Sequence, residues 1–144
     1  MTIALVIVGC TRRKAAVTRP VPAYLLYQGG LVPALRDRLG TGSARWERVR
    51  FLSARHGLVH ATQRLLPYDQ PLTAESARRL RPVVRRQFNE ECARIPERLL
   101  IVCERSYRDL LGIPDRPPAA MYWVGDIRGG WPQVAGILDS WGWR

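Results

Sequence analysis

A glycine, a cysteine and a run of cations follow the first apolar segment of the sequence. Residues 3–8 (IALVIV) are apolar and rich in β-branched side chains, and they end at Gly9, where a glycine permits a tight turn. The polar residues that come next are Thr11, Arg12, Arg13 and Lys14. A hydroxyl and three cations behind such a turn suit an anionic group such as a phosphate or a carboxylate. The glycine spacing is that of neither a Walker loop nor a dinucleotide-binding loop, and the sequence predicts no cofactor.

Lys14 and Cys10 are the reactive residues of this segment. Lys14 is the only lysine among 23 cationic residues, and all the others are arginine. An ammonium group can lose its proton when it is buried and a guanidinium cannot, so a working amine is the cation that arginine replaces least well. Cys10 is a candidate nucleophile because neighbouring cations stabilise a thiolate. The alternative for Cys10 is a small residue buried at the end of a strand.

A second polar segment, residues 53–57 (SARHG), follows another apolar run. His56 is one of two histidines in the chain, and an imidazole at the end of a strand is suited to acid–base catalysis. A histidine in that position can also serve only to hydrogen-bond the backbone. The candidates for ligand contacts beside it are Ser53, Arg55 and Gly57.

Aromatic and acidic residues of the following loops complete the predicted site. Asp69 is a candidate carboxylate that orients His56 or pairs with Lys14, and its structural alternative is a turn residue. Tyr68 precedes it and offers a ring that can stack on a ligand or donate a hydrogen bond. The remaining candidates for ligand binding are Tyr27, Ser106 and Tyr107.

The elements that must position these residues follow from the apolar pattern. Continuous apolar runs predict strands that are buried on both faces, which is typical of parallel sheets. These runs are residues 3–8, 49–53, 99–103 and 120–124. Because ligands of open α/β sheets bind beyond the carboxyl ends of the strands, the segments after these runs are expected to share one cleft.

Helical patterns alternate with these strands. The patterns cover residues 31–39, 73–94, 107–111 and 131–141. Thr73 is the predicted N-cap of the second helix, with Ser76 three residues on, and Pro82 predicts a kink or a break within it. Pro132 suits the first turn of the last helix. We therefore expect one α/β domain over residues 1–144, with three layers and a mostly parallel sheet of about four strands covered by helices on both faces.

The composition limits the class of protein. The longest apolar run has six residues, far below the ~20 that a membrane-spanning helix needs, so we expect no membrane partner and a cytoplasmic location. The cysteines at positions 10, 92 and 103 have no paired spacing, which predicts neither a disulfide framework nor a zinc site or other metal centre.

The net charge of +11 indicates an anionic partner. One cluster of arginines falls within a single predicted helix and is a candidate nucleic-acid surface: Arg78, Arg79, Arg85 and Arg86. The alternative is a solvated helix face in a chain whose coding bias favours arginine.

Several of these segments together resemble a bacterial and phage family of uncharacterised domains. The matching residues are Gly9-Cys10 with Lys14, Pro22-Ala23 with Leu26-Tyr27, residues 51–58 (FLSARHGL), and Pro67-Tyr68-Asp69. Members of that family are sometimes described as similar to the peroxide-stress protein YaaA. The segment from Cys10 to Lys14 is also distantly similar to the uracil-DNA-glycosylase-like domains joined to archaeal tRNA-guanine transglycosylases. The resemblance implies nucleobase or nucleic-acid chemistry.

Three hypotheses of function follow. The first is an enzyme that acts on a nucleotide or a modified nucleobase by hydrolysis or transfer at an N-glycosidic bond. In it Arg12, Arg13 and Lys14 hold the anionic group, Tyr27 and Tyr68 sandwich the base, and His56 and Asp69 activate water or stabilise an oxocarbenium-like state. The second is a non-catalytic nucleic-acid-binding protein linked to protection of DNA under stress. The third is an enzyme that uses the Lys14 amine to form a Schiff base or an amide, with no nucleic acid involved.

Overall fold

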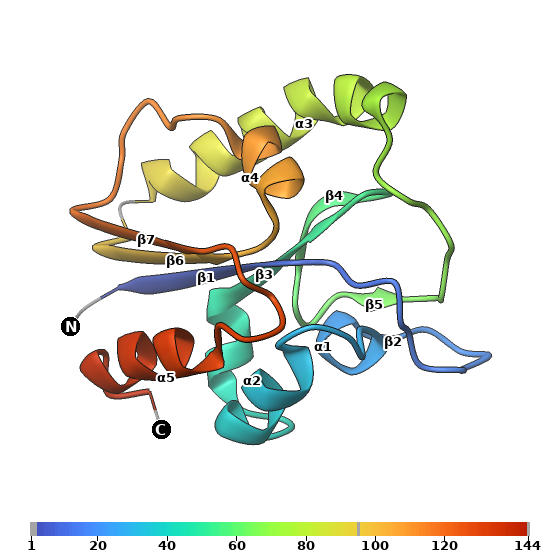
Figure 1. Ribbon diagram of the computed structural model, residues 1–144, viewed down its shortest axis with the longest axis horizontal. Coiled ribbons are helices and arrows are strands. Elements are labelled where there is room, and N and C mark those ends of the chain that lie inside the picture. Colours follow the sequence, from blue (N-terminus) through green and yellow to red (C-terminus); the bar gives the residue numbers. More distant parts are fainter. Residues whose placement is uncertain (1–2, 95, 144) are drawn as a thin grey trace.

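The computed structural model describes residues 3–94 and 96–143, and a twisted sheet lies at its centre (Figure 1). In this part of the chain five strands form the main sheet in the order β4-β3-β1-β6-β7. They are β1 (Ala4–Gly9), β3 (Val49–Ser53), β4 (Gly57–His60), β6 (Arg98–Val102) and β7 (Ala120–Val124). Strand β4 runs antiparallel to β3, and the other pairs are parallel. The segments that follow β1, β3, β6 and β7 therefore meet at one edge of the sheet.

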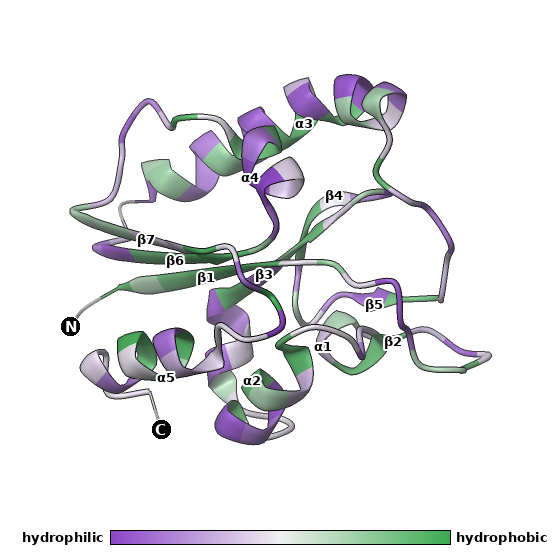
Figure 2. Cartoon of the chain, viewed as in Figure 1, coloured by the Kyte–Doolittle hydropathy of each residue, from purple (hydrophilic) through white to green (hydrophobic). Residues whose placement is uncertain are grey.

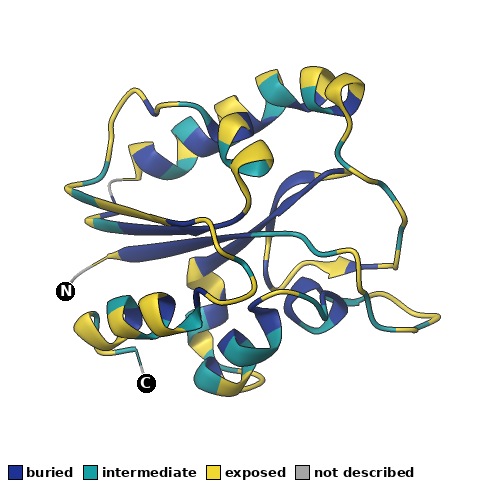
Figure 3. Ribbon diagram, in the orientation of Figure 1, coloured by how far each residue is buried: buried dark blue, intermediate teal, exposed yellow. Residues whose placement is uncertain are grey.

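Helices cover both faces of this sheet, as Figure 1 shows. The side chains of β1 alternate between the faces: Leu5 and Ile7 join one apolar core, and Val6 and Val8 join the other. The first core is covered by α3 (Ala74–Ala93) and α4 (Arg105–Leu111). The second is covered by α1 (Ala23–Leu26), α2 (Val32–Leu39), the 3-10 helix at Ala44–Arg48 and α5 (Trp131–Ser140). The strands are apolar and buried while the outer faces of the helices are polar and exposed (Figures 2 and 3). The expected α/β class with helices on both faces is confirmed.

Helix α3 shows why its sequence forms one long element. Thr73 and Ser76 make a reciprocal capping box, as expected, and the buried residues recur every four positions from Ser76 to Cys92. Of the kink or break expected at Pro82, the break is wrong, because one helix continues through this residue. Pro82 is exposed, and so is Arg78, whose carbonyl loses its N–H partner, so water can replace the missing donor.

The structure corrects the expected strands in two places. About four strands were expected, and the described residues form five in the main sheet, because residues 57–60 belong to β4 and not to a loop. Gly57 has a φ of 75°, which favours glycine, and this turn pairs the returning chain with Ser53. Residues 15–30, for which no strand or helix was predicted before residue 31, hold β2 (Val21–Pro22) and α1, and β2 pairs with β5 (Arg64–Leu65). The other predicted strands and helices lie within two residues of their expected bounds, and the 3-10 helix at Ala44–Arg48 was not predicted.

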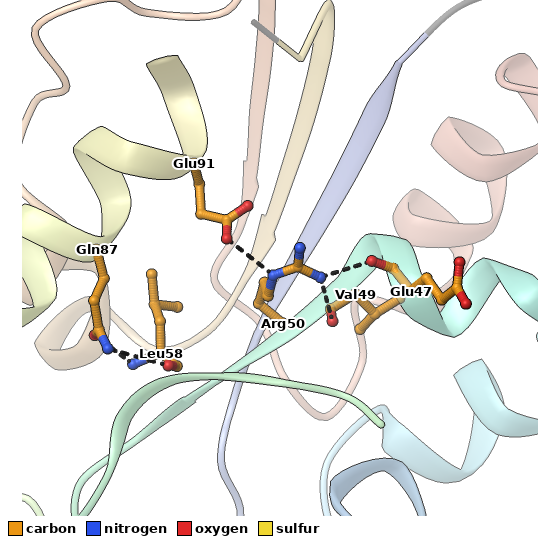
Figure 4. Close-up of polar contacts among 6 residues, drawn as sticks. All are labelled: Glu47, Val49, Arg50, Leu58, Gln87 and Glu91. Carbon is orange, nitrogen blue, oxygen red and sulfur yellow. Dashed lines mark hydrogen bonds and ion pairs between the residues drawn. The ribbon is translucent and has the colours of Figure 1, made fainter. Parts of the chain in front are cut away.

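Polar contacts fasten α3 to the β3–β4 edge of the sheet (Figure 4). Nε of Arg50 on β3 lies 3.1 Å from Oε1 of Glu91, and both side chains are largely buried. The amide of Gln87 accepts the N–H of Leu58 (2.9 Å) and donates to its carbonyl oxygen (3.3 Å). None of the helices in residues 3–94 and 96–143 is long and apolar enough to cross a membrane.

Candidate functional site

Gly9 lets the end of β1 lie directly against the end of β6. A Cβ atom at Gly9 would lie 2.8 Å from Cβ of Cys103, closer than two carbon atoms pack. The N–H of Cys10 donates to the carbonyl oxygen of Leu52 (2.9 Å), so β1 remains tied to β3 up to that residue. A residue without a side chain is therefore needed at position 9, where the chain packs against Cys103 just before Cys10.

Hydrogen bonds of the Thr11 hydroxyl and of the backbone hold the loop after Cys10 in place. The Thr11 hydroxyl donates to the carbonyl oxygen of Arg13 (2.9 Å) and accepts the N–H of Gly29 (3.2 Å). Lys14 forms a backbone bridge with Tyr27. These contacts hold the cations of the loop at defined positions beside the sheet edge.

A cleft of about 410 Å³ opens at this edge. Its walls come from residues 10–14, 29–30, 69–72, 104 with 106–107, and 127–128. The volume falls within the roughly 300–1,000 Å³ of small-molecule sites. The expectation of a shared cleft beyond the strand ends thus agrees with the geometry for the segments after β1, β6 and β7.

Charged side chains of both signs line this cleft. Among the described residues its cations are Arg12, Arg13, Lys14 and Arg128, and its carboxylates are Asp69 and Glu104. Asp126 supports Arg128, because its carboxylate accepts the N–H groups of Gly129 (2.9 Å) and Arg128 (3.1 Å). These two hydrogen bonds, from Gly129 and then Arg128, lower the pKa of Asp126 below its ordinary value.

Cys10, which directly follows β1, and Tyr107 on α4 meet in the lining of the cleft. Sγ of Cys10 lies 3.3 Å from the Tyr107 hydroxyl, and both residues are among the lining side chains. Burial, and after it the nearby thiol, raises the pKa of Tyr107 above its ordinary value, so the phenol stays protonated at neutral pH. Tyr107 can therefore donate a hydrogen bond to a ligand, whereas Ser106 contributes an exposed hydroxyl at the rim.

A chain of hydroxyl groups lies beside the cleft. The Tyr68 hydroxyl is 2.5 Å from the Tyr27 hydroxyl and 2.5 Å from Oγ of Ser53. Oγ of Ser53 in turn accepts the backbone N–H groups of Arg55 (3.1 Å) and His56 (3.0 Å). Burial raises the pKa of Tyr27 to about 12 and raises that of Tyr68 as well, so both phenols are neutral. This chain locks Tyr68 to the end of β3.

The ring of Tyr68 supports Lys14. Nζ of Lys14 lies 4.4 Å from the centre of the Tyr68 ring and 5.9 Å from that of Tyr27. Partial burial lowers the pKa of Lys14 below its ordinary value of 10.5, and nearby Cys10 and Asp69 oppose this effect. Lys14 is thus an ammonium group held between an aromatic ring and the cleft.

The lowered pKa of Lys14 predicts how it reacts. An amine-reactive ester should acylate Lys14 with a pH midpoint below 10.5, because the neutral amine forms at lower pH than in an unburied lysine. The measurement is the labelling rate against pH, followed by peptide mass mapping that separates Lys14 from the N-terminal amine. The urea-unfolded chain is the control and should show the ordinary midpoint. A folded-state midpoint equal to that of the unfolded chain would contradict the prediction.

The structure places the other predicted residues beside the cleft and not in it. His56 is exposed, and its ring meets that of Tyr68 edge-on at 5.1 Å. No hydrogen bond joins His56 to Asp69 within the described chain, so Asp69 does not orient the imidazole. Arg55 is exposed, with its guanidinium carbon 5.9 Å from the Tyr68 ring centre.

The predicted sandwich of a base between Tyr27 and Tyr68 is wrong. The two rings are inclined at 85° and joined through their hydroxyl groups, and Tyr27 is fully buried. Of the charged cleft residues, Glu104 was not among the predicted site residues, and Arg128 was predicted only as part of residues 126–130, a segment after the fourth strand that could supply a polar contact. The signal that points to both is their position just after β6 and β7, since ligands bind at that end of the strands.

The arginine cluster of the second hypothesis lies on α3, on its outer face. Arg78, Arg79, Arg85 and Arg86 are exposed. A Cβ atom at Gly112 would lie 3.0 Å from Nε of Arg85, so that side chain packs against the end of α4. Within the described residues, no group of three or more His, Cys, Asp or Glu side chains is arranged to hold a metal ion.

Comparison with family models identifies the chain. The model of DUF6884, described as a family of unknown function, matches residues 5–121. The chain belongs to this family. The DUF6884 match contains every segment of the cleft except residues 127–128. Comparisons with curated proteins and with solved structures give no match. The expected membership of an uncharacterised domain family is confirmed, and the finer similarities to YaaA and to uracil-DNA-glycosylase-like domains gain no support.

Proposed function

We propose that the protein is an enzyme that cleaves the N-glycosidic bond of a nucleotide, by hydrolysis or by transfer to another acceptor. The observation that supports this proposal is the cleft itself, which combines four cations with two carboxylates in its described lining. Cations suit a phosphate group, and carboxylates suit the positive charge that develops on a sugar when its bond to a base breaks.

The residues divide into two roles. Arg12, Arg13 and Arg128 bind the phosphate through forked guanidinium groups, and Lys14 adds a compact ammonium. Asp69 stabilises the charge on the sugar and takes a proton from the attacking water. The water oxygen bonds to the sugar carbon, the bond to the base nitrogen breaks, and its electron pair leaves with the base, which gains a proton from solvent. Tyr107 donates a hydrogen bond to the departing base.

His56 enters this proposal only indirectly. It contacts the Tyr68 ring and does not line the cleft, so the general-base role expected for it passes to Asp69, with Glu104 as the second carboxylate. The similarities to YaaA and to uracil-DNA-glycosylase-like domains, predicted from the sequence, point to the same class of chemistry and stay predictions.

The test is release of free base from nucleoside 5′-monophosphates, followed by chromatography. Asp69→Asn is expected to lower kcat by about 10²–10⁴-fold, the range of a lost general base. The matched control is Glu75→Gln on α3, an exposed carboxylate outside the cleft, which should leave kcat unchanged. No turnover on any of the monophosphates, or equal turnover by Asp69→Asn and Glu75→Gln, would overturn the proposal.

A second candidate function is nucleic-acid binding without catalysis. It is favoured by the exposure of Arg78, Arg79, Arg85 and Arg86 on the outer face of α3. Neutralising all four should then abolish binding to nucleic acid, and unchanged binding would exclude α3 as the binding surface.

A further inference from the structure

The positive charge of this protein is concentrated in its first half. Residues 1–68 contain eleven cationic residues and two acidic ones, Asp37 and Glu47, and so carry nine of the eleven net positive charges. The rest of the chain holds 12 cationic and 10 acidic residues and is nearly balanced. Such an asymmetry indicates an anionic partner with several charges that faces the elements from β1 to β5.

Some cations of this half stabilise the fold. Arg36 donates to the carbonyl oxygen of Tyr24 (2.9 Å), Arg38 pairs with Asp139, and Arg50 pairs with Glu91. These side chains are committed to contacts within the molecule and leave little charge for a partner.

Six other arginines of the same half have no such commitment, and five of them lie on the side of the cleft. Their side chains are exposed, and no described residue forms a hydrogen bond or an ion pair with them. These five are Arg12, Arg13, Arg19, Arg55 and Arg64, and the sixth, Arg48, comes just before β3, at the end of that strand away from the cleft. Exposed guanidinium groups that form no ion pair within the protein are suited to bind phosphates.

These five arginines extend from the cleft along one side of the molecule. Arg12 and Arg13 line the cleft, and Arg55 and Lys14 both lie against the Tyr68 ring (5.9 Å and 4.4 Å). Arg64 on β5 pairs with Pro22 on β2, and Arg19 comes just before β2. Figure 1 shows β2, β5 and the loop after β1 together on the right of the molecule.

We infer that the nucleotide in the cleft belongs to a longer single strand of nucleic acid, and that Arg19, Arg55 and Arg64 bind the neighbouring phosphates. This inference rests on the proposed function and names its substrate class. A base inside a duplex cannot reach a cleft formed by loops at a sheet edge, whereas an unpaired nucleotide can. A strand that continues past the cleft meets cations on the β2–β5 side, which a free mononucleotide leaves unused.

Binding of a fluorescent single-stranded oligonucleotide tests this inference. Phosphate contacts by the five arginines alone predict a log–log salt slope of about −3 to −4, since each contact contributes about −0.7 on single strands, and contacts by Lys14 and Arg128 in the cleft make the slope steeper. Arg19→Gln/Arg64→Gln should raise Kd about tenfold at low salt and bring the slope about 1.4 closer to zero. The matched control is Arg78→Gln/Arg86→Gln, which removes the same charge from α3 and should leave both values as in the wild type.

Equal weakening by the two double variants would overturn the inference, because charge alone and not position would then decide binding. Binding to anionic phosphatidylserine vesicles in place of the oligonucleotide, lost in Arg19→Gln/Arg64→Gln, would overturn it in favour of a membrane surface.

Base release separates this inference from the proposed function. Oligonucleotide binding through Arg19 and Arg64 without release of base refutes the catalytic step and leaves the strand-binding surface intact. The opposite outcome is release of base from mononucleotides while the oligonucleotide binds no more tightly than a mononucleotide. It would refute the single-stranded substrate and leave the proposed enzymatic function intact.

Discussion

Replacing Tyr68 by phenylalanine is expected to lower the free energy of unfolding by about 3 kcal/mol, because each buried polar group left unpaired costs about 1–3 kcal/mol. The Tyr68 hydroxyl is the middle member of the chain that joins Tyr27 to Ser53. Both of those neighbours are fully buried, so the loss of this one oxygen leaves two hydroxyl groups without their partner. Urea unfolding followed by circular dichroism measures the difference.

Tyr27→Phe is the matched control. Its expected effect on the free energy of unfolding follows from the three hydroxyl hydrogens of the chain. Two backbone N–H groups occupy both lone pairs of Ser53 Oγ, so its hydrogen goes to Tyr68. The Tyr27–Tyr68 contact uses one more hydrogen, and the third has no acceptor among the described residues. Tyr27→Phe therefore removes a surplus donor and one hydrogen bond, at a cost of about 1 kcal/mol. A cost for Tyr27→Phe as large as that for Tyr68→Phe would refute this arrangement.

Replacing Arg50 by methionine is expected to cost about 3–5 kcal/mol, the usual result of removing one partner from a buried ion pair. The side chains of Arg50 and Glu91 are only 8% and 14% exposed, so the carboxylate left behind has little access to water (Figure 4). The carbonyl oxygen of Glu47 also loses its donor, which lies 2.7 Å away. Arg48→Met, at an exposed arginine two residues earlier, should change stability by less than about 0.5 kcal/mol.

The double variant Arg50→Met/Glu91→Leu decides whether the buried charge or the lost packing causes the effect. Apolar residues of similar volume remove both charges, so we expect most of the lost stability to return. A double variant as unstable as Arg50→Met alone would show that the ion pair is not the cause. Urea unfolding of the wild type, Arg50→Met, Glu91→Leu and the double variant completes the cycle.

The strands that are buried on both faces could be predicted from the sequence, because burial restricts their side chains to apolar types. Residues 4–9 and 98–102 are buried on both faces and carry apolar side chains at nearly every position, so the pattern shows them directly. Strand β4 was missed because a turn at Gly57 and the Gln87 side chain define it, and neither leaves an apolar run. The break at Pro82 was predicted from local preference, which tertiary packing of α3 overrides.

The sequence predicts which residues lie near the cleft better than it predicts what each residue does there. Cys10, Lys14 and Tyr107 line the cleft because they follow buried strands, and that relation is visible in the sequence. His56 also follows a strand, but β3 turns at once into β4 and leaves its ring outside the cleft. Glu104 and Arg128 follow β6 and β7 in the same way, but their roles could not be predicted, since their neighbours in the cleft come from distant parts of the chain.

The contact between Cys10 and Tyr107 joins residues 97 positions apart. During synthesis Cys10 leaves the ribosome long before Tyr107. Strand β1 can pair with β6 only after β6 has also been synthesised. A nascent chain that ends before Tyr107 therefore lacks the site. The site forms only when β1 pairs with β6 in the middle of the sheet. A ligand bound there holds the early and late parts of the chain together, so it opposes unfolding of the whole sheet and not only of a loop.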